Sequence, residues 1–310
     1  MAPSRLPSFL EPAAFAADAA SMDRRWTLEE SLAYTRWLST HHYENFHVVS
    51  FLLPKELHQD FYNVYAFCRW ADDLGDEIGD TGESLRLLGW WRELLLSAEV
   101  PRHPVFVALR PTIEARRLPM ACFEDLIQAF EQDQIVTRYA NWDEVMRYCV
   151  KSANPVGRLV LALGGYHDEV RGVLSDYTCS GLQLANFWQD VRVDIGKERI
   201  YLPLDLLARH GVKEEDIAGL GHSMQFEAAM REAVAYARTL FERGLPLIPT
   251  LDARLSLDVE LFSRGGLAIL DKIEACGYRV LDERPKIEKA ERVVLLLRTV
   301  LSWSRKRIFG

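Results

Sequence analysis

Hydrophobic residues recur at intervals of three and four along most of the chain, whereas strict alternation over the length of a strand is hard to find. This is the spacing of amphipathic α-helices and predicts an all-α protein. Two helix starts carry a capping-box pattern, in which an N-cap residue is followed three positions later by Glu: Thr27 with Glu30, and Asn141 with Glu144. Proline and glycine mark the breaks between helices, at positions 54, 79–82, 101–104, 119, 155, 164–165, 203, 219–221, 246–249 and 277.

None of these breaks is long or polar enough to be a domain linker, and no repeat of fixed period is evident. The pattern therefore predicts one helical domain over residues 24–310. An Ala- and Pro-rich segment before it is expected to be a flexible tail over residues 1–23.

The 310 residues include 45 acidic and 37 basic side chains, a formal net charge of −8. This balance argues against a nucleic-acid partner, which needs a broad basic face. The five cysteines are scattered without CxxC spacing, which fits neither a disulfide framework nor a zinc module. Buried thiols in a reducing compartment are expected instead, and so is a cytoplasmic location, because no signal peptide or 18-residue apolar run is present.

The C-terminal segment allows two interpretations. Positions 293–301 are apolar except for Arg298 and Thr299, and Arg305, Lys306 and Arg307 follow. Such a segment is either a last core helix with a solvated basic end, or a peripheral contact with anionic lipid at the inner membrane surface.

Two acidic clusters stand out. In the first, Asp72 and Asp76 are four residues apart and share a helix face with Arg69 and Tyr65, and Asp73 is adjacent.

In the second cluster, Gln183, Asn186, Asp190 and Asp194 form one polar stripe on an otherwise apolar helix. Polar groups that face a core cost stability unless they have a partner, so this stripe is expected to line a cavity. A lone pair of Asp four residues apart is usually a solvated helix face; two such clusters favour a function.

Carboxylates about 5 Å apart repel by roughly 1 kcal/mol in water and more at a protein-like dielectric, and a bound cation offsets that cost. Oxygen ligands suit Mg²⁺, which takes one or two carboxylates and fills its coordination with water and substrate phosphate oxygens. Two facing carboxylate helices thus suggest a magnesium–diphosphate site. Arg69, Lys197 and Arg199 are nearby candidates for phosphate oxygens.

Other motifs are weaker. Glu44 and His47 form half of a di-iron pattern whose second half is absent from the sequence. No dinucleotide fingerprint, phosphate-binding loop or HExxH pair is present, so no nucleotide cofactor is expected.

These motifs resemble the squalene/phytoene synthase family of prenyl synthases. YAFCRWADDLGDE, from Tyr65, is similar to the first aspartate-rich motif of that family, and QLANFWQDVRVDIGKERIYLP, from Gln183, to the second. SANPVG, from Ser152, resembles its central segment. The resemblance covers residues 27–292 and implies a helical bundle around a central active-site cavity.

Within the family, the combination of motifs is most similar to the hopanoid-pathway members. That resemblance implies Mg²⁺-dependent conversion of presqualene diphosphate and water to hydroxysqualene and diphosphate, without NADPH. It also implies residue roles. The implied metal ligands are Asp72, Asp73, Asp76, Asp190 and Asp194. The implied substrate contacts are Arg69, Gln183, Asn186, Lys197, Arg199 and Arg284. Tyr65, Tyr148 and Asn154 are either shapers of the carbocation step or core residues.

The chain also departs from the pattern of many condensing members. It has His42-Tyr-Glu-Asn-Phe46 where many members have a serine-rich segment, and Gln189 where many have Arg. It has Gly266 near a position where many members have an aromatic residue. These departures predict a less basic and roomier pocket, suited to one substrate. The alternatives are a condensing enzyme that makes presqualene diphosphate, squalene or phytoene, and a non-catalytic assembly factor of the same fold.

Overall fold

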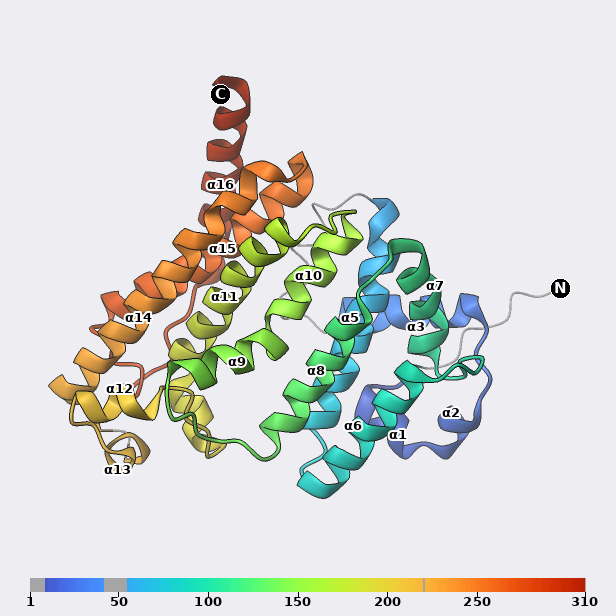
Figure 1. Cartoon of the computed structure of the whole chain (residues 1–310), viewed down its shortest axis with the longest axis horizontal. Helices are drawn as coiled ribbons and strands as arrows, with labels where there is room; N and C mark the ends of the chain where they lie inside the picture. Colours follow the sequence, from blue (N-terminus) through green and yellow to red (C-terminus); the bar gives the residue numbers. More distant parts are fainter. Residues whose placement is uncertain (1–8, 42–54, 220, 310) are drawn as a thin grey trace. The chain divides into compact units, whose positions relative to one another are not determined.

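The computed structural model describes residues 9–41, 55–219 and 221–309, with side chains described as far as residue 303. The described residues form helices joined by turns and irregular segments, and their only β-pairing is an isolated bridge between Arg138 and Ile200. The all-α prediction is therefore confirmed. The helices are α1 Pro12–Ala17, α2 Ala19–Asp23, α3 Leu28–His41, α5 Lys55–Asp76, α6 Thr81–Leu96, α7 Pro104–Arg116, α8 Met120–Asp133, α9 Trp142–Ser152, α10 Asn154–Leu163, α11 Glu169–Gly196, α12 Leu204–Arg209, α13 Glu214–Ala218, α14 Met224–Gly244, the 3₁₀ helix η1 Leu245–Thr250, α15 Ala253–Ala275 and α16 Lys289–Phe309 (Figure 1).

Local sequence signals set many of these boundaries. At the start of α3, the Thr27 amide donates to Glu30 Oε2 at 3.0 Å and the Glu30 amide donates to Thr27 Oγ1 at 3.3 Å, which is the predicted capping box. At α9 the Glu144 amide donates to Asn141 Oδ1 at 3.1 Å, while the Glu144 side chain accepts from the amide of Ala140 rather than of Asn141. Helix ends are thus encoded by neighbouring residues.

The chain divides into two compact units, Met1–Ile135 with Leu159–Tyr166 and Val136–Arg158 with His167–Gly310. In the first unit α3, α6, α7 and α8 each pack against α5. Its core holds a group of aromatic rings in which Trp70 stacks on Trp91 with centroids 5.0 Å apart, and the Trp70 indole donates to Tyr34 Oη at 3.0 Å. This packing fixes the orientation of α5, the helix that carries the first acidic cluster. A single domain over residues 24–310 stays a prediction.

The segment before residue 24 differs from the predicted flexible tail. Within it, residues 12–23 form α1 and α2, and Phe15 is buried. The Phe15 ring lies 5.2 Å from Trp70 and 5.0 Å from His103, centroid to centroid. Burial of one aromatic ring stabilises by about 1.5–3 kcal/mol, which is enough to hold a short helix whose own propensity is marginal.

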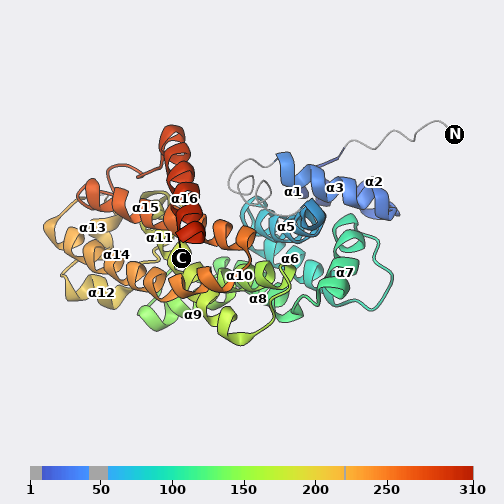
Figure 2. The same cartoon turned by 90° about the horizontal axis from the view of Figure 1, so that it is seen from above.

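In the second unit α14 and α15 pack against α11, and the three helices lie side by side in both views (Figure 1; Figure 2). α11 approaches α14 closely at Gly181, where an added Cβ would lie 3.2 Å from the Phe241 ring. The Trp188 indole donates to the Ala233 carbonyl of α14 at 3.1 Å. These contacts hold rigid the helix that carries the second acidic cluster.

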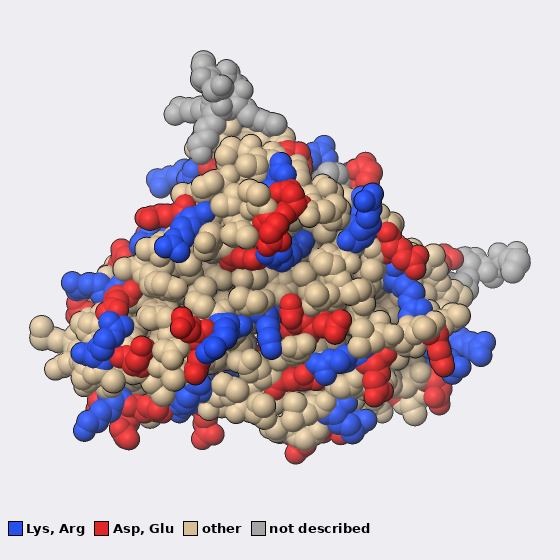
Figure 3. Space-filling view, in the orientation of Figure 1, with Lys and Arg blue, Asp and Glu red and all other residues tan. Residues whose placement is uncertain are grey.

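The described surface carries both signs of charge. Lys and Arg are interspersed with Asp and Glu over the face in Figure 3, without a broad basic area there. No helix among the described residues is both long enough and apolar enough to cross a membrane.

Candidate active site

The first acidic cluster lies on the last turns of α5. Arg69 forms an ion pair with Asp73, and a second, longer one with Asp72 at 3.5 Å. The Asp73 side chain is only 5% exposed, whereas Asp72 is half-buried and Asp76 is exposed. Although burial lowers the pKa of Arg69, the charges of Asp73 and Asp72 outweigh this and raise it. Asp72 and Asp76 are therefore the accessible carboxylates of this cluster, and Asp73 is mainly a partner for Arg69.

Tyr65 lies one turn before Arg69 and is half-buried. Burial is the main cause that raises the pKa of its phenol to about 12, and the charge of Arg69 opposes it. Tyr65 is thus a neutral hydroxyl beside the acidic cluster at physiological pH.

The second cluster lies on about the last four turns of α11. Asn186 is exposed, and Gln183, Asp190 and Asp194 are half-buried. Arg284 reaches the cluster from a segment 94 residues later in the chain: its Nε pairs with Asp190 Oδ1, and its Nη2 lies 3.1 Å from Oδ2. This bidentate contact is the strong form of an arginine–carboxylate pair. It places the predicted late basic residue on the predicted metal ligand.

Lys197 and Arg199 follow the end of α11. Their amides both donate to the Asp194 carbonyl, at 2.9 and 2.8 Å, so the chain turns back over the last turn of the helix. Glu198, between them, has a φ of 58°. The turn keeps both cations close in sequence and in space to the end of α11 that carries Asp194.

Tyr148 is buried in an aromatic group behind the second cluster. Its ring centroid lies 5.9 Å from Phe187 and 5.8 Å from Tyr201, and Phe187 stacks on Tyr201 at 3.7 Å. This packing favours the core interpretation of Tyr148. The group packs against the apolar side of α11, the helix that carries Asn186 and Asp190 on its polar stripe.

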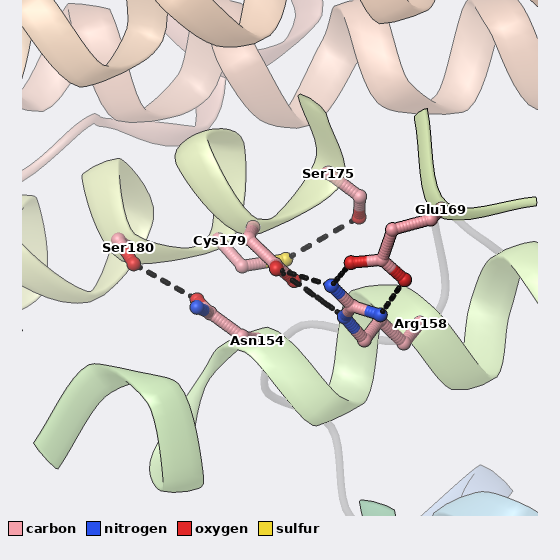
Figure 4. Close-up of polar contacts among 7 residues, drawn as sticks. Asn154, Arg158, Glu169, Ser175, Cys179 and Ser180 are labelled. Carbon is pink, nitrogen blue, oxygen red and sulfur yellow. Dashed lines mark hydrogen bonds and ion pairs between the residues drawn. The ribbon is translucent and has the colours of Figure 1, made fainter. Parts of the chain in front are cut away.

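Asn154, in the SANPVG segment, is buried at the start of α10. Its Oδ1 accepts a 2.8 Å hydrogen bond from Ser180 Oγ of α11, and Arg158, one turn on, pairs with Glu169 and Asp176 at 2.8 and 2.7 Å (Figure 4). Between these two residues lies Gly157, where an added Cβ would come within 2.3 Å of Ser175 Oγ and 2.5 Å of Cys179 Sγ. The segment is therefore a contact between the start of α10 and α11, and Asn154 acts in it as a packing residue.

One prediction drawn from the departures in the sequence needs correction, and a second stays a prediction. A Cβ at Gly266 would lie 2.4 Å from Phe241 Cζ and 2.9 Å from Leu182 Cδ2, so a neighbouring ring fills the space and no extra room exists there. Gln189 is buried, and its Nε2 donates to the Pro285 carbonyl at 2.5 Å. It therefore holds the backbone of a later segment, and the less basic pocket stays a prediction.

Two further sequence features, His42-Tyr-Glu-Asn-Phe46 and the Glu44–His47 pair, lie outside the described residues.

The carboxylates of the two acidic clusters fit Mg²⁺ that is bound together with a diphosphate. No three His, Cys, Asp or Glu side chains of the described ranges lie together as a ready-made metal site. Each acidic helix instead offers two accessible carboxylates four residues apart: Asp72 with Asp76, and Asp190 with Asp194. Mg²⁺ is commonly bound by one or two carboxylates together with phosphate oxygens and water, so these residues fit a metal that arrives with a diphosphate.

Solved structures identify the fold as that of the all-α isoprenoid synthases. The chain is similar to the squalene synthase HpnC of Alicyclobacillus acidocaldarius, with a TM-score of 0.76 and 37% identity over 86% of this chain and 98% of that one. It also superimposes on a dehydrosqualene synthase in complex with a ligand, with a TM-score of 0.77, 23% identity and coverage of 90% and 98%.

Comparison of sequences identifies the family as well as the fold. The squalene/phytoene synthase family profile matches residues 39–291, and the chain belongs to this family. It is 33% identical to the hydroxysqualene synthase of Zymomonas mobilis over 82% of this chain and 86% of the relative. It is 31% identical to the phytoene synthase of Thermus thermophilus, with coverage of 91% and 95%. The protein is thus a member of a family of prenyl diphosphate-processing enzymes.

Sequence reasoning missed the roles of Gln189 and Arg192. Arg192 Nη1 donates to the Leu281 carbonyl at 2.9 Å and also to the Asp282 carbonyl. The only sequence signal was that polar residues interrupt an apolar helix, and a signal of that kind does not reveal a backbone partner about 90 residues away.

Proposed function

We propose that the protein converts presqualene diphosphate and water to hydroxysqualene and diphosphate, with Mg²⁺ as cofactor. The observation that carries the diphosphate part of this proposal is the contact of Arg284 with Asp190, because it joins a phosphate-binding cation to an accessible carboxylate. The likeness to the hydroxysqualene synthases of Zymomonas mobilis and Rhodopseudomonas palustris, each at 33% identity, favours the hydrolytic reaction.

Bound Mg²⁺ would supply charge neutralisation at the diphosphate and so favour its departure. Asp72, Asp76, Asp190 and Asp194 would hold it, with Asp73 keeping Arg69 in place on α5. The accessible basic and amide groups would pair with phosphate oxygens that the metal leaves free. These are Arg69, Gln183, Asn186, Lys197, Arg199 and Arg284.

The proposed reaction breaks the C–O bond between the cyclopropylcarbinyl carbon and the diphosphate, and the electron pair leaves with the diphosphate. The carbocation rearranges with opening of the ring, and water adds through its oxygen and loses one proton. No hydride donor is needed. Tyr65, as a neutral hydroxyl, is suited to orient the water or the leaving group by hydrogen bonding. Tyr148 and Asn154 would support the site through packing.

A condensing reaction is the second candidate, because the phytoene synthase of Thermus thermophilus is nearly as similar to this chain. The two are separated by supplying purified protein and Mg²⁺ with presqualene diphosphate, farnesyl diphosphate or geranylgeranyl diphosphate alone, each with and without NADPH. The proposal expects an alcohol product from presqualene diphosphate and no coupled product from the other two. Presqualene diphosphate from farnesyl diphosphate, squalene when NADPH is present, or phytoene from geranylgeranyl diphosphate would favour the alternative. A non-catalytic assembly role is contradicted by turnover of any of these substrates.

We further propose that α16 brings the protein to a membrane surface that holds its lipophilic substrate. Thr299 is buried and the Trp303 indole donates to Ser256 of α15, so one side of α16 packs on the protein. The apolar residues of another side remain between 45% and 62% exposed: Val293, Val294, Leu297 and Leu301. The sequence of α16 has six basic residues and one acidic residue, which favours anionic lipid.

A further inference from the structure

Five residues that follow α15 lie against α11 through their own backbone. This segment, residues 281–285, has the sequence Leu-Asp-Glu-Arg-Pro. At one end its Leu281 carbonyl accepts from Arg192 at 2.9 Å, and at the other its Pro285 carbonyl accepts from Gln189 at 2.5 Å. Both donors come from α11. Because the acceptors are main-chain carbonyls, the two contacts fix the path of the segment whatever its side chains are.

Between these two anchors lies Arg284. Pro285 is the next residue, and Gln189, which holds Pro285, immediately precedes Asp190, which receives the Arg284 guanidinium. Gln189 is 6% exposed, so its amide has lost most of its water and depends on this hydrogen bond. Arg284 itself is 47% exposed and would move freely on an unanchored segment.

The contact has a chemical consequence for Asp190. A carboxylate whose two oxygens both face one guanidinium cannot offer the same lone pairs to a metal ion. Arg284 also supplies a positive charge at Asp190, which offsets the repulsion between Asp190 and Asp194, one turn apart, when no metal is bound. Arg284 and a divalent cation are therefore competitors for one carboxylate.

We propose that Gln189 and Arg192 are positioning residues that hold segment 281–285 on α11, so that Arg284 occupies Asp190 until a metal replaces it. The inference rests on the proposed function in one respect, that the entering cation belongs to a metal–diphosphate substrate. Displacement then leaves the guanidinium beside the newly bound phosphate, with its backbone still anchored. We call the anchoring of segment 281–285 by Gln189 and Arg192 the clamp. It does not depend on which prenyl diphosphate reacts.

The experiment uses the full-length protein without substrate. Gln189→Leu removes one anchor, Arg192→Gln removes the other, and Arg284→Gln removes the competing cation. Arg279→Gln is the matched control, because Arg279 pairs with Asp282 of the same segment at 2.5 Å and is 55% exposed. Hydrogen–deuterium exchange of residues 279–288 reports the clamp, and calorimetric titration with Mg²⁺ or Mn²⁺ reports the competition.

We expect faster exchange in residues 279–288 for Gln189→Leu and Arg192→Gln, and little change for Arg279→Gln. Arg284→Gln should bind the cation about 5-fold or more tightly than the wild type, the lower end of a typical coupling between two sites. The anchor variants should show a smaller gain. A merely structural role for Gln189 would leave cation affinity unchanged.

Two results would overturn the inference separately from the proposed function. Unchanged exchange in both anchor variants would remove the clamp, and equal or weaker cation binding by Arg284→Gln would remove the competition. If Gln189→Leu does not fold, Arg192→Gln makes the same test from the other anchor. Failure of the wild type to release hydroxysqualene, with these binding results intact, would instead count against the proposed reaction alone.

Discussion

Arg69 and Asp73, one helical turn apart on α5, form an ion pair in which the carboxylate is almost completely buried. Asp76, three residues after Asp73 on the same helix, is exposed. Adjacent members of one acidic motif thus have different physical environments. This difference divides the motif into a residue that stabilises the helix and residues that are open to a ligand.

The first prediction contrasts these two residues. Asp73→Asn should lower the free energy of unfolding by about 1–3 kcal/mol, because it removes the charged partner of Arg69 and leaves a buried neutral amide in its place. Asp76→Asn should change stability by no more than about 0.5 kcal/mol, since the side chain is exposed. Denaturant unfolding measures both. Turnover of a prenyl diphosphate should be lost in Asp76→Asn despite its stability, and full activity in that variant would contradict its assignment as a metal ligand.

The second prediction concerns His103, which is buried among aromatic rings and accepts a hydrogen bond from the Val105 amide through Nδ1. Burial lowers the pKa of this imidazole from 6.5 to about 3. Between these two values the unfolded chain binds a proton that the folded protein does not. Stability should therefore fall as the pH is lowered below 6.5, by about 1.4 kcal/mol for each pH unit from this group.

The test compares urea unfolding at pH 7.5 and 5.5 for the wild type and for His103→Asn. Asn keeps a side-chain acceptor at the N-cap of α7 but does not titrate in this range. The variant should be less stable at both pH values because it fills less of the core, yet its stability should depend less on pH. The same pH dependence in both proteins would show that His103 is not the responsible group.

The third prediction uses two glycines. Gly157→Ala should destabilise the protein by about 1–3 kcal/mol, because the new methyl group displaces Ser175 and Cys179 where α10 meets α11 (Figure 4). Gly89→Ala, in the interior of α6 with open space around it, should stabilise by up to about 1 kcal/mol. Thermal unfolding of the two variants is the measurement. Equal shifts of the same sign would argue against close contact at Gly157.

The fourth prediction tests the proposed membrane face of α16. Leu297→Glu should weaken co-sedimentation with vesicles that contain anionic lipid, because it places a negative charge among exposed apolar residues. The matched control is Val170→Glu on α11, since Val170 is 73% exposed on another helix of the same unit. Binding should also weaken at high salt. Equal binding of Leu297→Glu and the wild type would contradict the proposal.

The sequence predicted the features that depend on neighbouring residues. The predicted break at 101–104 ends where α7 begins, Thr27 and Glu30 cap α3, and Asp190 and Asp194 share a turn of α11, all because local geometry follows from local sequence. The role of Arg284 as a substrate contact came from family resemblance and stays a prediction; its ion pair with Asp190 was not predicted.

Features that depend on packing between residues far apart in the chain could not be predicted from the sequence. The fit of Phe241 against Gly266 joins α14 to α15, and the bond from Gln189 spans 96 residues. Burial of Phe15 against Trp70 likewise needs the folded α5. Periodicity shows which face of a helix is apolar, but it does not identify which neighbour fills that face.

The most direct test of the central claim is incubation of the purified protein with presqualene diphosphate, Mg²⁺ and ¹⁸O-labelled water, without NADPH, followed by mass spectrometry of the lipid and of the released diphosphate. The proposed reaction predicts hydroxysqualene with one ¹⁸O atom and diphosphate without label, because water adds to carbon and the C–O bond breaks. Unlabelled alcohol, label in the diphosphate, or no turnover by folded protein that binds the metal would contradict it.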